Sequence, residues 1–558
     1  MEATDYRNKT VTEMDRHLFI INILITKCLT KKTLNMKMRF FAAAIAATAL
    51  LAASCTKERT QQGTSIDPQT GKAIVEGTQT YACFNFRITS GTRASMLNDA
   101  GEPSNASMPV KSLRLLIFRN STTSTACEYN QDVPITGMKM NNGVLLSSGV
   151  KRIFVIANAG TAVNALLNSI TVNTTTQAQF LSTISELKVG DYVASPLTDT
   201  FDIAELVGNA TNGMVLSNVA DDSSIQTLAP SITEAQAVSG PDNQITLTVK
   251  RVVAKGKVLY KDNSVLTTDN GLGTLSSLSY AIRNVRRSTF LVQQFRSGTD
   301  VLCPNDAVTS ADYGTDYDSY RPYFFSMAEY VPAYAFDYEV GNLSPVVDDA
   351  TAKAYYFTED INGTQRWGNV TWAAVKAVFT PISGKWVSAT TYDVVNKKFL
   401  TVTYGTTVVP VGTTLYVTKI DGNGLLKRAI FTNETAALQA AYSTKYPGYA
   451  WNDDAGAPVS FATFSGSKAQ WEDALDEYVG GVCYYQIIFG SGNTGDNSFE
   501  SGVLRNNYYK ATISKFAGIG STTETGDTDP GDPIATKTYV NVDITIEDWN
   551  IVTSDIES

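Results

Sequence analysis

The sequence predicts an all-β protein with a few short helices, and three observations support this. The composition includes 27 tyrosines, and Thr, Ser, Asn and Gly fill the stretches between apolar runs, as is typical of β-sheets joined by polar loops. Several apolar runs are short and end at polar turns, which indicates buried strands of a β-sandwich. The chain beyond its leader is long enough for two or more domains of roughly 100–200 residues each.

The first predicted element is an export signal. Lys37 and Arg39 precede the apolar run Phe40–Leu51, and small residues then lead to Cys55. The run is too short to cross a bilayer, which takes about 20 apolar residues. The pattern therefore predicts a secretory signal peptide that ends in a lipobox, with Cys55 as the residue that receives the lipid.

The residues before Met36 are unusual for an export signal, because they include acidic side chains and a second apolar patch, Leu18–Ile25. We expect translation to start at Met36 or Met38, so that residues 1–35 take no part in the fold. A functional cytoplasmic extension is the alternative. On either interpretation, residues 1–54 comprise the extension and the signal peptide.

A polar tether, residues 56–77, leads to the first predicted strand, residues 80–88. Its side chains alternate, with Ala82, Phe84, Phe86 and Ile88 on one face and Cys83, Asn85 and Arg87 on the other. A period of two over this length predicts a half-buried strand. A loop without core residues follows, from Thr89 to Ser95.

The rest of the first half contains further strands and one helix. Strands are predicted at Leu113–Phe118, Ile153–Ala159 and Ile245–Val249, and a helix at Thr176–Lys188. The composition changes around residues 240–243, and strand character resumes over Arg251–Tyr260. We therefore place a domain boundary close to residue 250, between domains of residues 94–250 and 251–558.

The second half repeats this pattern. Strands are predicted at Lys398–Tyr404, Thr414–Thr418 and Cys483–Phe489, helices at Glu434–Tyr442 and Lys468–Tyr478, and a loop at Ser521–Pro533. In the last strand Val540, Val542, Ile544 and Ile546 alternate, and the pattern then shifts by one residue to Trp549 and Ile551. Such a shift predicts a bend or bulge at Glu547–Asp548.

Several function classes are disfavoured. The net charge of −9 and the absence of a basic stripe argue against nucleic acid. His17, in the doubtful leader, is the only histidine, so the commonest general base and metal ligand is missing from the rest of the chain. The six cysteines are far apart, which predicts neither a disulfide framework nor a zinc site. We expect no enzyme activity, no cofactor and no metal.

Two loops match binding motifs only in part. Residues 490–495 fit G-x-G-x-x-G, but no helical pattern follows, so a hairpin loop is favoured over a dinucleotide site. The acidic loop at residues 527–532 lacks the last ligand of an EF-hand, since Thr538 stands there. A looser calcium site stays open as an alternative to a solvated loop.

The first strand and its loop are the strongest functional candidate. Arg93 lies among small polar residues, where proteolysis concentrates, and a cut between Arg93 and Ala94 would detach the strand. Its loss would open an apolar groove with unpaired backbone edges, which can accept a strand from another chain. The C-terminal segment is a plausible donor. The alternative is that Arg93 is an ordinary solvated loop residue.

Six segments of the chain follow one another in a characteristic order: the lipobox at Cys55, the first strand with Arg93, residues 150–159, residues 249–255, residues 503–513 and residues 544–549. In these segments the chain resembles the fimbrillin family of the Bacteroidales, the type V pilins of FimA or Mfa type, and most closely the minor, Mfa-type shaft subunits. The resemblance extends over nearly the whole exported part of the chain.

The resemblance implies two transthyretin-like β-sandwich domains and a structural pilin. Residues 55–93 would be a lipidated propeptide of an outer-membrane precursor, removed by an arginine-specific, gingipain-like protease. The candidate donor residues are Trp549, Ile551, Val552 and Ile556, and the donor strand is either residues 550–558 alone or also includes part of residues 539–549. The implied partners are further copies, accessory fimbrial subunits and unidentified surface receptors. The alternatives are an anchor or tip subunit, or a glycan-binding surface lipoprotein.

Overall fold

The computed structural model describes most of the chain between residues 77 and 548. The longer described stretches are 77–88, 110–136, 139–184, 213–297, 300–304, 354–361, 366–393, 398–419, 428–434, 475–489, 502–526, 529–532 and 540–548, with shorter pieces between them. The chain forms two compact units, residues 1–66 and 67–558. In the first unit β1 (Ser65–Ile66) is described, and β2 (Ala73–Ile74) begins the second. Both interrupt the predicted tether.

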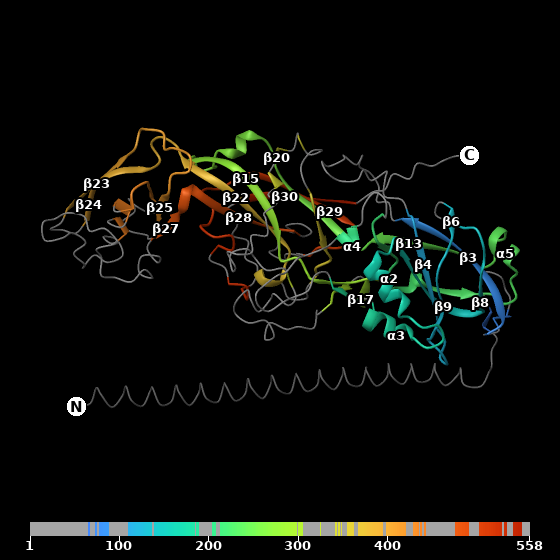
Figure 1. The fold of residues 1–558 in the computed structure, drawn as a ribbon. Coiled ribbons are helices and arrows are strands. Elements are labelled where there is room, and N and C mark those ends of the chain that lie inside the picture. The colour runs from blue at the N-terminus through green and yellow to red at the C-terminus, as the bar shows by residue number, and fades with distance from the viewer. Residues whose placement is uncertain are drawn as a thin grey trace, which may run out of the picture. The chain divides into compact units, whose positions relative to one another are not determined.

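Ten of the described strands before residue 252 form one mixed sheet (Figure 1). Its order is β5-β4-β9-β11-β13-β3-β7-β6, with β12 beside β9 and β8 beside β3. The strands are β3 (Gln79–Ile88), β4 (Leu113–Arg119), β5 (Cys127–Asp132), β6 (Ile135–Thr136), β7 (Lys139–Met140), β8 (Val144–Ser147), β9 (Gly149–Ala157), β11 (Leu216–Ser217), β12 (Ile225–Leu228) and β13 (Gln244–Arg251).

Alternate residues of β4 and β9 pack into two separate cores. Leu115 and Val155 join the cluster that holds β3, whereas Leu116 and Phe154 join a cluster with Phe180. The rings of Phe154 and Phe180 lie 5.1 Å apart, centre to centre. Because both faces are covered, these strands are continuous apolar runs rather than alternating ones.

The second half forms three larger described sheets. Their orders are β20-β14-β29-β30 with β21 beside β14, β19-β15-β22-β28, and β24-β23-β26-β25-β27. The strands are β14 (Val253–Tyr260), β15 (Gly273–Arg283), β19 (Gly341–Asn342), β20 (Ser344–Pro345), β21 (Tyr355–Thr358), β22 (Trp372–Pro381), β23 (Val387–Asp393), β24 (Lys398–Tyr404), β25 (Leu415–Thr418), β26 (Ile430–Phe431), β27 (Leu475–Tyr478), β28 (Val482–Ile488), β29 (Asn507–Phe516) and β30 (Val540–Asp548). Smaller sheets pair β10 (Glu186–Lys188) with β16 (Ser288–Phe290) and β17 (Gln294–Ser297) with β18 (Asp300–Leu302).

The sheets of β14 and β22 share one apolar core. Val258 and Tyr509 enter it from the first sheet, and Val375 and Tyr485 from the second. This is the arrangement of a β-sandwich, and it confirms the predicted all-β class. β13 ends at Arg251 and β14 begins at Val253 in another sheet, so the boundary predicted near residue 250 falls at a change of sheet. That boundary stays a prediction, because both sides belong to one compact unit.

Helices are short. The described ones are α2 (Thr161–Asn168), α3 (Gln177–Gln179), a π-helical turn (Phe180–Ile184), α4 (Ala204–Val207) and α5 (Glu234–Ser239), with single 3₁₀ turns at Asp222–Ser224, Asn263–Leu266, Trp367–Asn369 and Val479–Gly481. Helical backbone is also described within the predicted helix Glu434–Tyr442. No helix in the described part of the chain is long and apolar enough to cross a membrane.

Two predicted helices are partly wrong. The helix expected at Thr176–Lys188 ends by Ile184, and Glu186–Lys188 is strand β10, paired with β16. Leu475–Tyr478, placed in a helix ending at Tyr478, is strand β27, and it pairs with β25. In both cases a partner strand far away in sequence overrides the local helical spacing.

The described strands largely match the predicted ones. Eight strands lie where apolar runs predicted them: β3, β4, β9, β13, β14, β24, β25 and β28. Their ends agree with the prediction within two residues, except that β9 begins earlier, at Gly149. β30 is also a strand, but its pairing with β29 runs regularly through Glu547 and Asp548. The register shift lies instead between Ile513 and Lys515 on β29, so the bulge predicted at Glu547–Asp548 is not at those residues.

Three buried ion pairs connect distant parts of the second half. Arg505 Nε lies 3.0 Å from Glu359 Oε2, Arg283 Nη2 lies 2.8 Å from Glu524 Oε1, and Arg286 Nη2 lies 3.0 Å from Asp360 Oδ1. All six side chains are at most 5% exposed. An arginine buried without its carboxylate is strongly destabilising, so the loss of any one of these carboxylates should destabilise the second half.

Candidate functional site

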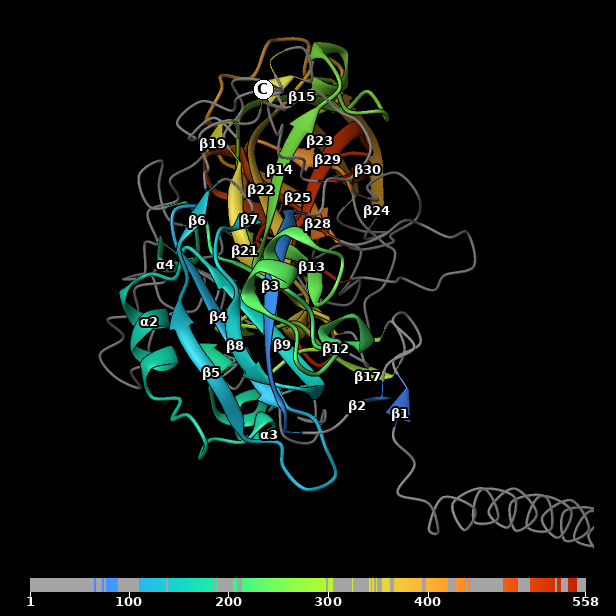
Figure 2. The ribbon, with the colours of Figure 1, turned by 90° about the vertical axis from the view of Figure 1, so that its right-hand side faces the viewer.

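β3 is the first strand of the main sheet in sequence, but it lies inside the sheet rather than at its edge. Residues 79–82 pair antiparallel with β8, and residues 83–88 pair in parallel with β13 (Figure 2). Asn85 also faces Lys139 of β7. Its removal would therefore leave unpaired backbone edges on β8 and β13.

The side chains of β3 fill the core beneath it. Ala82, Phe84 and Phe86 are buried, and Ile88 is partly buried against the same cluster. Cys83 was expected on the outer face but is fully buried, because its thiol lies against β7 and donates to the carbonyl of Met140 at 3.6 Å. Burial of two phenylalanines corresponds to roughly 1.5–3 kcal/mol each. An empty position would expose this apolar surface.

The start of β3 is held by a buried hydrogen-bond network that the sequence patterns did not reveal. Thr80 Oγ1 donates to Ala229 O at 2.7 Å and accepts from Ile232 N at 3.1 Å. Asn243 Nδ2 donates to Thr80 Oγ1 at 3.0 Å and to Tyr81 O at 2.9 Å. Asn243 has a φ of 53°, which Asn tolerates better than most residues, and its place in a Gly-Pro-Asp-Asn turn was the available signal.

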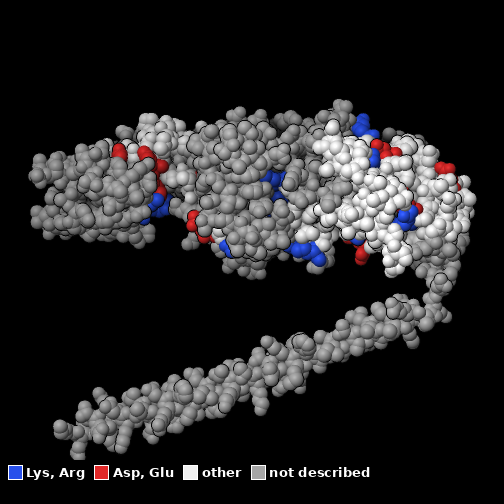
Figure 3. All heavy atoms as spheres, turned by 60° about the horizontal axis from the view of Figure 1, so that its bottom comes forward, with Lys and Arg blue, Asp and Glu red and all other residues white. Residues whose placement is uncertain are grey.

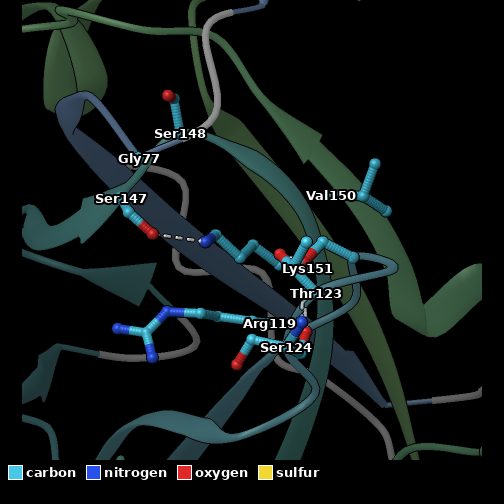
Figure 4. A pocket seen from close by; sticks show the side chains of 9 residues that line it. Gly77, Arg119, Thr123, Ser124, Ser147, Ser148, Val150 and Lys151 are labelled. Atoms are coloured by element: carbon cyan, nitrogen blue, oxygen red, sulfur yellow. Dashed lines mark hydrogen bonds between the residues drawn. The ribbon is translucent and has the colours of Figure 1, made fainter.

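A polar cavity of about 210 Å³ lies where the chain enters β3 (Figure 4). It is lined by Gly77, Arg119, Ser121, Thr123, Ser124, Ser147, Ser148, Val150 and Lys151. The backbone before β3 forms one wall, since Ser148 N donates to Thr78 O at 2.7 Å and Thr78 N donates to Ser148 Oγ at 3.2 Å.

Two cations meet at this cavity. Arg119 and Lys151 are directly opposite each other on β4 and β9, and Glu128 of β5 separates their charges. Glu128 Oε2 lies 2.7 Å from Lys151 Nζ and 3.6 Å from Arg119 Nε. Burial alone would raise the pKa of Glu128, but hydrogen bonds from Lys151 and Ser147 outweigh it and hold that pKa below its usual value. The three side chains leave one positive charge in excess.

Other predicted site residues lie outside the described part of the chain. They are the lipidation residue Cys55, the cleavage pair Arg93 and Ala94, and the donor candidates Trp549, Ile551, Val552 and Ile556. Their roles stay predictions. The loop at residues 490–495 is also outside. The described strand nearest the donor candidates is β30, which forms the edge of its sheet beside β29.

Catalytic and metal-binding features are sparse in the described residues. They contain no group of three or more His, Cys, Asp or Glu that could hold a metal ion. Cys83, Cys127, Cys303 and Cys483 are free and buried, and burial raises the pKa of Cys303 to about 12. These thiols therefore act as small apolar side chains. On the face shown in Figure 3, described Lys and Arg side chains are scattered and form no stripe.

Two family models match the chain. Residues 82–251 match the model of "Major fimbrial subunit protein (FimA)", and residues 476–555 match "Major fimbrial subunit protein type IV, Fimbrillin, C-terminal". The first match begins within β3 and ends with β13, so it contains most of the site just described. The second contains β27 to β30 and most of the segment after β30.

Solved structures with similar folds were also found, at low sequence identity. A putative cell adhesion protein from Parabacteroides distasonis is 15% identical, with a TM-score of 0.40, and covers 85% of this chain and 100% of its own. A fimbrilin from Porphyromonas gingivalis is 12% identical, with a TM-score of 0.38, and covers 85% and 99%. The tip fimbrial protein Mfa3 of the same species is 13% identical, with a TM-score of 0.33, and covers 84% and 100%. No curated protein sequence matches the chain significantly.

The two family matches include the N-terminal sheet with β3 and the C-terminal strands, in the order that the sequence resemblance indicated. Residues 82–251 and 476–555 of the chain thus belong to the fimbrillin family of fimbrial subunits.

Proposed function

We propose that this protein is a shaft pilin of a surface fimbrium that polymerises by strand exchange. The precursor is exported as a lipoprotein, lipidated at Cys55, and cut between Arg93 and Ala94. The cut separates β3 from the rest of its sheet. The C-terminal segment of another copy then fills the position that β3 leaves, and the polymer supports adhesion at the cell surface.

One observation supports this proposal above the others. β3 lies between two paired strands and carries buried aromatic side chains, yet only the 21 residues from 89 to 109 separate it from the next long described stretch. A single cut among them leaves β3 bound by hydrogen bonds and packing alone. A strand with that placement can be exchanged for an equivalent strand without rebuilding the rest of the sheet.

The proposal assigns a timing to the lipid. Before the cut, Cys55 holds an occupied, assembly-incompetent subunit at the outer membrane. After the cut, residues 55–93 leave together with the lipid and β3. The domains would then be residues 94–250, which accept a strand, and residues 251–558, which donate one.

The test is whether Arg93 controls assembly. Cells that express Arg93→Ala should accumulate the longer, lipid-linked precursor and form no fibres in electron micrographs. Arg87→Ala is the matched control, because Arg87 is an exposed residue of β3 itself and its replacement should leave fibres unchanged. Fibres of normal yield from Arg93→Ala would contradict the proposal. An N-terminus at acylated Cys55 in surface material would indicate an anchor subunit instead.

A further inference from the structure

The site of β3 also specifies which residues replace it and in which direction. Resting on the proposed function, we propose that residues 549–553 of a second copy occupy the site antiparallel to the direction of β3. Thr553 takes the place of Thr80, and the acidic residues that follow it lie at the cavity of Arg119 and Lys151.

The position of Thr80 requires a hydroxyl group. Ile232 N donates to this oxygen, Asn243 Nδ2 donates to it, and Ala229 O accepts from it. Thr80 is 1% exposed, so a strand without a hydroxyl removes these bonds out of reach of water: Ile232 N loses its bond to Thr80, and Asn243 Nδ2 and Ala229 O keep only their bond to each other and that of Asn243 to Tyr81 O. A strand with Ser or Thr at this position restores all three bonds, and an apolar residue there leaves Ile232 N unsatisfied.

The two inward positions after Thr80 require apolar residues, because Ala82 and Phe84 are fully buried. The segment 549–558 has three hydroxyl residues, Thr553, Ser554 and Ser558, and each of them can be placed at the Thr80 site. Read backwards, Ser554 places Asn550 at the Phe84 site, and Ser558 places Ser554 there. Read forwards, Ser554 places Ser558 at the Phe84 site, and Thr553 places Asp555 at the Ala82 site.

Only Thr553 read backwards along the site meets all three requirements. It places Ile551 at the Ala82 site and Trp549 at the Phe84 site. Between them, Val552 takes the place of partly buried Tyr81, and the amide of Asn550 can donate to Met140 O, as the thiol of Cys83 does.

The reversed direction exchanges the two backbone pairings. The positions of Thr80, Tyr81 and Ala82 pair antiparallel with β8, and those of Cys83 and Phe84 pair in parallel with β13. A strand of opposite direction pairs in parallel with β8 and antiparallel with β13, and the two kinds of pair differ only slightly in stability per residue. The direction is therefore set by the side-chain requirements and not by the backbone pairing.

Charge complementarity supports the same register. With Thr553 at the Thr80 site, Asp555 lies at the place of Thr78, and Glu557 lies two residues further along. Thr78 bonds to Ser148, a lining residue of the cavity, and Arg119 and Lys151 exceed Glu128 by one positive charge. The two acidic side chains would bring negative charge to this cavity.

The register is tested by a disulfide across the new strand pair. Asn550 would lie directly opposite Gln244, and opposite residues of an antiparallel pair have Cα atoms about 4.5–5.5 Å apart, within reach of a disulfide. Fibres of the double variant Gln244→Cys, Asn550→Cys should show subunits joined by a disulfide in non-reducing gels. Gln244→Cys with Ile551→Cys is the matched control, because residue 551 points to the other face.

The outcomes separate the two proposals. Fibres that assemble without the 244–550 disulfide would overturn the register while leaving strand exchange intact. Cleaved wild-type subunits that form no fibres would overturn strand exchange itself. If the double-cysteine chain does not assemble, Thr553→Ser and Thr553→Val decide the matter. The serine variant should assemble at the wild-type rate and the valine variant on the order of tenfold more slowly, and equal rates would overturn the register.

Discussion

Asn243 donates a hydrogen bond of 3.0 Å from Nδ2 to Oγ1 of Thr80, a residue 163 positions earlier in the sequence. The bond joins the turn before β13 to the start of β3, and both residues also bond to Ala229 O. The network therefore sets the register of β3 at one end, whereas apolar packing holds the remainder. A slip by one residue would leave the hydroxyl site empty and turn every side chain of β3 to the other face.

The first prediction concerns this bond. Thr80→Val keeps the shape of the side chain but removes the hydroxyl, so buried Ile232 N loses its hydrogen bond to Thr80, and Asn243 Nδ2 and Ala229 O each lose one of theirs. The free energy of unfolding of the precursor should fall by about 1–3 kcal/mol, measured by urea denaturation. Thr246→Val, at an exposed position of β13, should change it by less than about 0.5 kcal/mol. Equal stability of the two variants would show that the network is unimportant.

The second prediction separates precursor from fibre. Phe84→Ala creates a cavity beneath β3, and such truncations cost about 3–5 kcal/mol in a well-packed core. The precursor should melt at a lower temperature than the wild type. Mature fibres should melt at the wild-type temperature, because β3 has left them. An equal loss of stability in both forms would mean that β3 stays in the polymer.

The sequence predicted β3 well because its face pattern is local. Its alternation of Phe84 and Phe86 with Asn85 and Arg87 needs no knowledge of the partners. Cys83 escaped the prediction because its thiol lies against the carbonyl of Met140 in β7, 57 residues away in sequence. The role of Asn243 was hidden for the same reason.

Local patterns also failed where strand pairing decided the structure. Leu475 and Tyr478 have helical spacing, but they are buried because β27 pairs with Leu415–Thr418, some 60 residues earlier. The shifted pattern after Ile546 predicted a bulge at Glu547–Asp548, whereas pairing with β29 continues through both residues. The charged core residues were equally invisible, since Arg505 and Glu359 are 146 residues apart.

The third prediction concerns that ion pair. Glu359 accepts hydrogen bonds from Arg505 Nε at 3.0 Å and Arg505 N at 3.2 Å. Glu359→Ala leaves the guanidinium buried without its carboxylate and should lower the free energy of unfolding by about 3–5 kcal/mol in urea denaturation. Asp269→Ala is the control, because its pair with Lys515 is about half exposed and should contribute less than about 1 kcal/mol. Similar losses in the two variants would contradict the importance of burial.

The fourth prediction is a pH dependence that originates at the cavity beside β3. Lys151 and Ser147 hold the pKa of Glu128 below its usual value despite burial, so folding favours the ionised carboxylate. The stabilisation is therefore complete above the unfolded pKa, roughly 4.3, and is lost as the pH falls through the lower pKa of the folded state. Between pH 7 and pH 3, wild-type precursor should lose more stability than Glu128→Gln in urea denaturation, because glutamine does not titrate. Asp132→Asn is the control. It removes an exposed carboxylate near Arg114 and should keep the wild-type dependence of stability on pH. If Glu128→Gln also keeps it, the acid sensitivity arises at other carboxylates.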